Sequence, residues 1–236
     1  MESKILTQSQ KVIEALLSHR REFMPILSRN LTRENIYILD NSEKNSDLAS
    51  MDISNVETFT KYIFDKIKQS GCLVGIGKYL EDRVIYRHSS LFAGESESRS
   101  LHLGIDVFVP TGTPLYAPLN GTVHSFRDNA EQGDYGPTII IRHELDGVLF
   151  YTLYGHLSRE SMASLRVGQN FASGDRLAEI GATKINGGWP PHVHFEIITD
   201  MLGRVGDFFG VAPLSRREYF ANLCPDPNLI LQIPGL

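Results

Sequence analysis

The spacing of hydrophobic residues divides the chain into three zones, of which the first, residues 1–72, has a helical pattern. Between residues 9 and 27, apolar side chains recur near the helical period. A second helix is expected from Ser54 onward, because Ser54 and Glu57 have the spacing of a capping box. Gly71 then stands where a helix commonly stops. These patterns predict a helical N-terminal region, whose role the sequence does not reveal.

The second zone, residues 73–200, consists of short apolar runs separated by turn residues. Glu81 and Asp82 separate the first two runs, which suggests a hairpin. Many short strands without intervening helices favour antiparallel sheets, as a sandwich or an open barrel. The predicted fold class is therefore mainly β, and α+β once the N-terminal helices are included. The expected strands cover residues 73–79, 83–88, 105–109, 115–117, 122–126, 138–143, 148–154, 176–180 and 192–198.

The third zone, residues 201–236, is rich in glycine and proline. We expect it to be a C-terminal tail that packs on the β-rich domain, with one helical turn near residues 215–223. The two cysteines, Cys72 and Cys224, are far apart and form no CxxC motif. Reduced thiols are therefore the expected state.

Charge and hydrophobicity exclude several classes of partner. The net charge is −5 and no block of Lys or Arg is present, which argues against nucleic-acid binding. No run approaches the roughly 20 apolar residues of a membrane span. Residues 1–23 lack the uninterrupted apolar core of a secretory leader. The sequence thus favours the cytoplasm, or the periplasm or extracellular space if a leader is missing or export is non-standard. It does not specify the oligomeric state.

Five residues in three segments form a candidate zinc site: His102, Asp106, His156, His192 and His194. Strand side chains alternate between faces, so the two histidines of the His-x-His pair share one face. A catalytic zinc takes three protein ligands and keeps a fourth position for water. Two imidazoles and one carboxylate meet that need and leave two histidines for proton transfer. A single strand histidine is more often structural, but the three segments together favour a metal site.

From His102 to Glu196 the sequence resembles the lysostaphin/LytM-type family of zinc metallopeptidases. The resemblance is carried by motifs spread over the whole stretch. They are His102-Leu-Gly-Ile-Asp106, Gly112-Thr-Pro-Leu-Tyr-Ala117, Gly121-Thr-Val123, Tyr135-Gly136, Ile141-Arg-His143, Tyr154-Gly-His-Leu157, Val167-Gly-Gln169, Ile180-Gly181 and His192-Val-His-Phe-Glu196.

The resemblance implies a role for each of the five candidate residues. The metal ligands would be His102, Asp106 and His194, and the catalytic histidines would be His156 and His192. The implied fold is a set of antiparallel β-sheets that form a groove, with one Zn²⁺ at its floor. The implied substrates are cross-bridges or stem peptides of bacterial cell walls.

Three further residues are candidates for the surroundings of the metal or for the substrate groove. Glu196 lies on the ligand face of its strand, either as a partner of a metal-bound histidine or as a solvent-facing carboxylate. Tyr154 precedes His156 by two residues, either as a hydrogen-bond donor or as a core aromatic. Trp189 is expected at the rim of the groove, in contact with substrate.

The expected function is that of a zinc-dependent metalloendopeptidase, a hydrolase that acts on peptidoglycan peptides. One alternative is a zinc amidohydrolase that acts on small or cytoplasmic peptides. Another is a non-catalytic regulator that keeps the scaffold. A latent enzyme is a further hypothesis, in which Glu81, Asp82 or His88 supplies a fourth zinc ligand.

Overall fold

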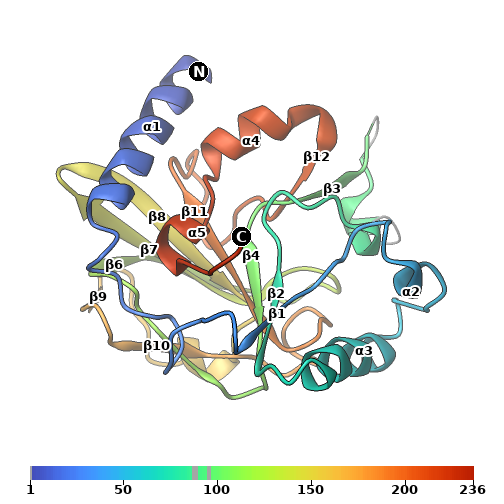
Figure 1. The fold of residues 1–236 in the computed structure, drawn as a ribbon. Coiled ribbons are helices and arrows are strands. Elements are labelled where there is room, and N and C mark those ends of the chain that lie inside the picture. The colour runs from blue at the N-terminus through green and yellow to red at the C-terminus, as the bar shows by residue number, and fades with distance from the viewer. Residues whose placement is uncertain (1, 87–89, 95–96) are drawn as a thin grey trace.

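An eight-stranded sheet forms the framework of the protein (Figure 1). The computed structural model describes residues 2–86, 90–94 and 97–236. The strands run in the order β1-β2-β4-β11-β8-β7-β6-β9, and every neighbouring pair is antiparallel except β1 with β2. The mainly antiparallel β fold predicted from the sequence is therefore confirmed. The strands are β1 (Ile36–Ile38), β2 (Val74–Gly77), β4 (Ile105–Phe108), β6 (Gly121–Asn129), β7 (Gly136–Leu145), β8 (Val148–Gly155), β9 (Asn170–Phe171) and β11 (His192–Ile198).

Two small antiparallel sheets accompany the large one. In the first, β5 (Pro114–Tyr116) pairs with β10 (Arg176–Glu179). In the second, β3 (Arg99–His102) pairs with β12 (Val211–Pro213), which brings the C-terminal zone beside the strand that ends at His102. The helical turn expected near residues 215–223 is present as a 3₁₀ turn followed by α4 (Arg217–Leu223), and α5 (Asn228–Leu231) comes last.

The N-terminal region holds α1 (Glu2–Ser18), α2 (Ser46–Ala49) and α3 (Val56–Gln69), but its boundaries differ from the prediction. Asn55, not Ser54, caps α3, because its side chain accepts a hydrogen bond from the Thr58 N–H while Ser54 bonds to Asp52. After α1 the chain leaves the helix, and the Met24 N–H binds the Pro118 carbonyl at 2.8 Å. Through β1 this region also joins the edge of the sheet. A domain boundary at residue 72 stays a prediction.

The predicted hairpin about Glu81 and Asp82 is wrong. β2 pairs with β1 and β4, and Val84–Tyr86 forms a 3₁₀ helix instead of a returning strand. The backbone of residues 82 and 83 pairs elsewhere, Asp82 with Leu101 and Arg83 with Ser42. The side chain of Arg83 is only 1% exposed and extends inward to Asp106.

The two central strands β4 and β11 separate an apolar face from a polar one. Val193, Phe195 and Ile197 of β11 pack in the main core, whereas His192 and His194 lie on the opposite face. All seven residues of β11 are nonetheless buried. Each large apolar side chain buried here contributes about 1.5–3 kcal/mol. The apolar side chains of β11 therefore fix the position of the strand, and with it the position of the histidines on its other face.

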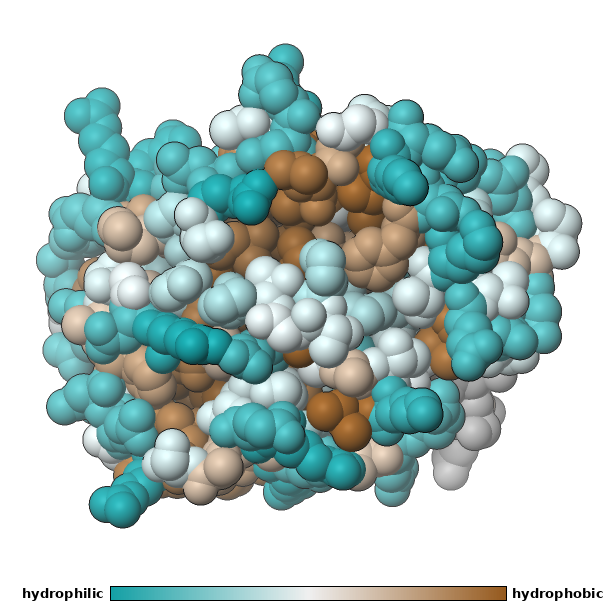
Figure 2. Space-filling view, turned by 90° about the horizontal axis from the view of Figure 1, so that it is seen from below, coloured by the Kyte–Doolittle hydropathy of each residue, from teal (hydrophilic) through white to brown (hydrophobic). Residues whose placement is uncertain are grey.

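Helices and loops cover the rest of the sheet. Phe59, Ile63 and Ile67 of α3 are buried and pack in one cluster with Phe108 of β4. The face seen in Figure 2 has hydrophobic residues in its central part and hydrophilic residues around most of its border.

Among the described residues, no helix has the length and apolar character needed to cross a membrane. Cys72 and Cys224 are both free thiols.

His143 of β7 is a buried hydrogen-bonding residue away from the polar face of β11. Its Nδ1 lies 2.8 Å from the Asn120 carbonyl and its Nε2 lies 2.7 Å from the Thr152 hydroxyl. Burial lowers the pKa of His143 from 6.5 to about 4. The unfolded chain therefore binds a proton more readily than the folded chain, so stability falls as the pH drops from 6.5 towards 4.

His143→Gln, which takes up no proton, should remove this share of the acid sensitivity. Between pH 7 and pH 5 the unchanged protein should lose roughly 2 kcal/mol more unfolding free energy than the variant. Urea unfolding at the two pH values measures the difference. Equal losses of unfolding free energy in the two proteins would mean that His143 takes up its proton as readily in the folded chain as in the unfolded chain.

Candidate metal centre

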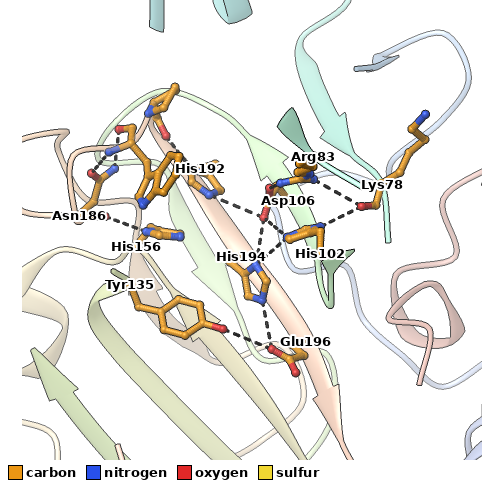
Figure 3. A network of polar contacts seen from close by, with 12 residues as sticks. Lys78, Arg83, His102, Asp106, Tyr135, His156, Asn186, His192, His194 and Glu196 are labelled. Atoms are coloured by element: carbon orange, nitrogen blue, oxygen red, sulfur yellow. Dashed lines mark hydrogen bonds and ion pairs between the residues drawn. The ribbon is translucent and has the colours of Figure 1, made fainter. Parts of the chain in front are cut away.

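The register of β4 and β11 places Asp106 directly opposite His194. Opposite residues of an antiparallel pair lie on the same face, with Cβ atoms about 4.5–5.5 Å apart. His102 is the last residue of β3, and a turn through Gly104 connects β3 to β4. The His102 side chain therefore lies beside Asp106 and His194. A Cβ on Gly104 would lie 2.5 Å from Cε1 of His194, so a larger residue there would displace the imidazole. The two segments of the sequence motif therefore meet on one face of the sheet (Figure 3).

His102, Asp106 and His194 form a group of three donors that could hold a metal ion. His102 Nε2 lies 2.9 Å from His194 Nδ1 and 3.1 Å from Asp106 Oδ1, and the last two atoms are 3.2 Å apart. Metal–ligand bonds of 2.0–2.2 Å in a tetrahedron separate neighbouring ligands by roughly 3.4 Å. The donor set and its spacing therefore suit a small divalent ion such as zinc.

The second nitrogen of each candidate ligand histidine has its own hydrogen-bond partner. His102 Nδ1 lies 2.9 Å from the Lys78 carbonyl, so it carries the proton and leaves Nε2 free to bind metal. His194 Nε2 lies 3.2 Å from Glu196 Oε2, which leaves Nδ1 free in the same way. Such partners fix the tautomer and the orientation of a metal-bound imidazole. Glu196 therefore contacts a candidate ligand histidine and is not a solvent-facing carboxylate.

Glu196 itself is completely buried, and its surroundings hold it in place. The Tyr135 hydroxyl lies 3.5 Å from Glu196 Oε2. Burial raises the pKa of Glu196 and, more strongly, that of Tyr135, so the phenol remains a donor near neutral pH. Tyr135 and Glu196 therefore orient His194 from behind (Figure 3).

Charges around the three donors shift their pKa values in different directions. Burial, together with the nearby Arg83, lowers the pKa of His102 to about 3. Burial also disfavours a proton on His194, but hydrogen bonds to Asp106 and Glu196 outweigh it and raise the pKa to about 9. For Asp106, the penalty of burial is overcome by His102 and Arg83, which hold the pKa well below its usual range. A metal ion would thus meet an ionised carboxylate and a neutral His102, and it would displace the Nδ1 proton of His194, whose Nε2 proton stays bound to Glu196.

His156 and His192 form a second pair beside the three donors. Their ring centroids are 4.2 Å apart. His156 Nδ1 lies 2.7 Å from the Asn186 carbonyl, and His192 Nδ1 lies 2.6 Å from the Pro190 carbonyl. Both rings therefore present Nε2 as the accepting nitrogen, and His192 Nε2 lies 3.7 Å from Asp106 Oδ1. Burial lowers the pKa of both, which keeps them neutral near pH 7.

The backbone at His156 is strained. Its φ is +64°, a left-handed conformation that non-glycine residues adopt only where the surroundings impose it. The His156 N–H binds the Tyr135 carbonyl at 2.7 Å, and its carbonyl accepts from the Gly181 N–H at 2.9 Å. This conformation also breaks the alternation along β8. Tyr154 consequently points to the core against Phe195, away from His156, and accepts a hydrogen bond from Thr152.

A groove opens beside these histidines, and aromatic side chains form much of its wall. His156, His192 and His194 line it together with Tyr86, Phe92 and Trp189. The Trp189 ring stands edge-on to the Tyr86 ring, with 6.0 Å between the ring centroids. The Trp189 Nε1–H binds the Asp134 carbonyl at 3.2 Å. Trp189 therefore lines the groove, and its contact with substrate stays a prediction.

Several residues of the site carry no recognisable signal in the sequence. Arg83 contacts Asp106, Asn186 holds both His156 and the loop to Trp189, and the Lys78 carbonyl orients His102. Of the candidate fourth ligands, Glu81 binds Arg83, Asp82 takes part in a backbone bridge to Leu101, and His88 lies outside the described residues. A latent state of the enzyme stays a prediction.

Glu196→Gln should weaken metal binding. The amide keeps the shape but loses the charge that attracts the His194 N–H, so metal affinity should fall about 10- to 100-fold. Competition with a chromophoric chelator measures the affinity. Glu144→Gln, at an exposed position of β7, is the matched control. Equal affinities in the two variants would show that Glu196 does not support the ligand.

Comparison with known proteins agrees with this geometry. Residues 100–204 match the model of Peptidase family M23. An uncharacterised metalloprotease of Haemophilus influenzae is 38% identical over 95 residues, which are 40% of this chain and 18% of that protein. The peptidoglycan DD-endopeptidase ShyA of Vibrio cholerae is 34% identical over 98 residues, which are 41% of this chain and 20% of that protein.

Among solved structures, a zinc-containing peptidase from Vibrio cholerae is 31% identical, with a TM-score of 0.34. The matched part is 42% of this chain and 27% of the Vibrio cholerae peptidase chain. The matches to the two curated relatives span about a fifth of those proteins' length. Residues 100–204, the part of the chain that matches the model of Peptidase family M23, contain all five histidine and aspartate residues of the site.

Proposed function

We propose that the protein is a zinc-dependent endopeptidase that hydrolyses peptide bonds in bacterial peptidoglycan. The observation that carries the proposal is the cluster of His102, Asp106 and His194, whose three donor atoms face one another at 2.9–3.2 Å. A catalytic zinc in such a set lowers the pKa of a water molecule and polarises a carbonyl. The ShyA relative, whose name states a peptidoglycan DD-endopeptidase activity, supports the substrate class.

The remaining histidines supply proton transfer. Peptide hydrolysis needs a base for the attacking water and an acid for the departing amine. His192 and His156 are neutral near pH 7 and keep Nε2 free to accept a proton. Because their Nδ1 protons are bound to backbone carbonyls, neither ring can turn away from the groove. The two residues are thus positioned to accept a proton from water and return it to the amine.

The walls of the groove suit an extended peptide with small side chains. Tyr86, Phe92 and Trp189 offer flat apolar surfaces, and Arg99 and Arg204 contribute cationic groups to the same lining. Peptidoglycan stem peptides combine small side chains with carboxylates, which complements such a lining.

Digestion of purified peptidoglycan tests the function. The protein should bind one zinc per chain, as measured by mass spectrometry, and release peptides whose new termini identify the bond that is cut. A chelator should abolish the release, and added zinc should restore it. Stoichiometric zinc without release of any wall peptide would refute the proposed substrate.

His156→Asn should separate catalysis from metal binding. Asparagine tolerates the left-handed backbone at this position but has no nitrogen that exchanges a proton near pH 7. We expect kcat to fall about 10²- to 10⁴-fold while zinc content stays unchanged. His19→Asn, at the end of α1, is the control. A variant that retains full activity would argue for a non-catalytic role of His156.

A further inference from the structure

We propose that Arg83 is the positioning residue of the metal ligand Asp106. We further propose that residues 77–86, which precede the part of the chain matched by the family model, complete the metal centre. The inference rests on the proposed metal site. It deepens that site by assigning a function to a segment outside residues 100–204.

The Arg83 guanidinium is shared among three buried partners. Its NH1 lies 2.5 Å from Asp106 Oδ2 and 3.1 Å from the Tyr86 hydroxyl, and its Nε lies 3.0 Å from Glu81 Oε2. The side chain is only 1% exposed. A planar guanidinium with partners on several edges cannot rotate without breaking these contacts. Arg83 therefore has one orientation, and it fixes that of Asp106.

The two oxygens of Asp106 consequently have different tasks. Oδ2 is bound to Arg83, whereas Oδ1 faces His102 at 3.1 Å and His194 at 3.2 Å. Since one oxygen is occupied, the carboxylate offers the metal a single donor. A carboxylate without Arg83 could rotate or bind through both oxygens, which would alter the number of ligands and the geometry of the site.

The sheet provides the space for this contact. Gly77 of β2 pairs with Asp106 on the side of β4 opposite to His194. A Cβ at Gly77 would lie 2.6 Å from NH2 of Arg83 and 3.2 Å from Oδ2 of Asp106. The absence of a side chain at this position therefore lets the guanidinium lie beside the carboxylate.

The same segment also holds the other ligand of the first motif. The carbonyl of Lys78, next to Gly77, accepts a hydrogen bond from His102 Nδ1–H at 2.9 Å. Glu81 balances the guanidinium charge and is itself bound by Lys78 Nζ at 3.1 Å. Residues 77–86 thus orient both His102 and Asp106, whereas Glu196 orients His194 (Figure 3).

Arg83 also lines the groove, so substrate binding is an alternative role for it. Its burial and its contacts with Glu81, Tyr86 and Asp106 oppose that role, because substrate would have to displace these partners. A purely structural ion pair is the other explanation. The positioning role differs from both in one respect: it predicts a change at the metal itself.

Metal binding by Arg83→Met tests the proposal without any activity assay. Methionine fills part of the space but leaves Oδ2 of Asp106 without its donor. We expect the zinc dissociation constant, measured by competition with a chromophoric chelator, to rise about 10- to 100-fold. The visible absorption spectrum of the cobalt-loaded protein should also change, since it reports the number and geometry of the ligands. Arg142→Met, at an exposed position of β7, is the matched control and should leave both unchanged.

The outcomes separate this inference from the proposed function. Failure of the unchanged protein to bind zinc would refute the metal site itself. Zinc binding by Arg83→Met with unchanged affinity and an unchanged cobalt spectrum would overturn the positioning role alone. Tighter binding would also overturn it, because the positive charge of Arg83 would then oppose the metal more than its hydrogen bond helps.

If Arg83→Met does not fold, as judged by circular dichroism, Arg83→Lys replaces it. Lysine keeps the charge but lacks the rigid fork that joins Glu81, Tyr86 and Asp106. It should therefore still weaken zinc binding about tenfold and alter the cobalt spectrum. A lysine variant identical to the unchanged protein in both measurements would refute the proposal.

Discussion

The pairing of β4 with β11 is the constraint on which the site depends. It sets Asp106 opposite His194 and, two residues further along, Phe108 opposite His192. A shift by one residue would turn the histidines of β11 into the core and Val193 and Phe195 out of it. The apolar residues behind the strands oppose such a shift, because they would lose their burial. The packing of the core thus determines where the candidate metal ligands lie.

The side chains of the candidate ligands are oriented by residues that are not themselves candidate ligands. Each ligand has a second contact: the Lys78 carbonyl for His102, Arg83 for Asp106 and Glu196 for His194. The other two histidines are held by backbone carbonyls of Asn186 and Pro190 in the loop before β11. Each of the five side chains is therefore oriented by a contact with the protein itself, which reduces the reorganisation required in the reaction.

The β-rich fold and the five candidate residues, which the structure brings together at one place, were both predictable from the sequence because they depend on local pattern. The period of two in His192-Val-His194 shows which side chains share a face, and the structure agrees. Long-range contacts gave no such signal. Arg83 is followed by an apolar run that resembles a strand, but the structure has a 3₁₀ helix there, and Arg83 contacts Asp106, which lies 23 positions further along the chain. The φ of His156 likewise follows from contacts with Tyr135 and Gly181.

The separation of the ligands along the chain has a consequence for the folding pathway. Asp106 and His194 lie 88 positions apart, and they meet only when the centre of the sheet closes. Contacts of such long range form after local hairpins such as β7–β8, because closing a long loop costs conformational entropy. The complete set of candidate ligands is therefore assembled late, when the sheet is nearly finished.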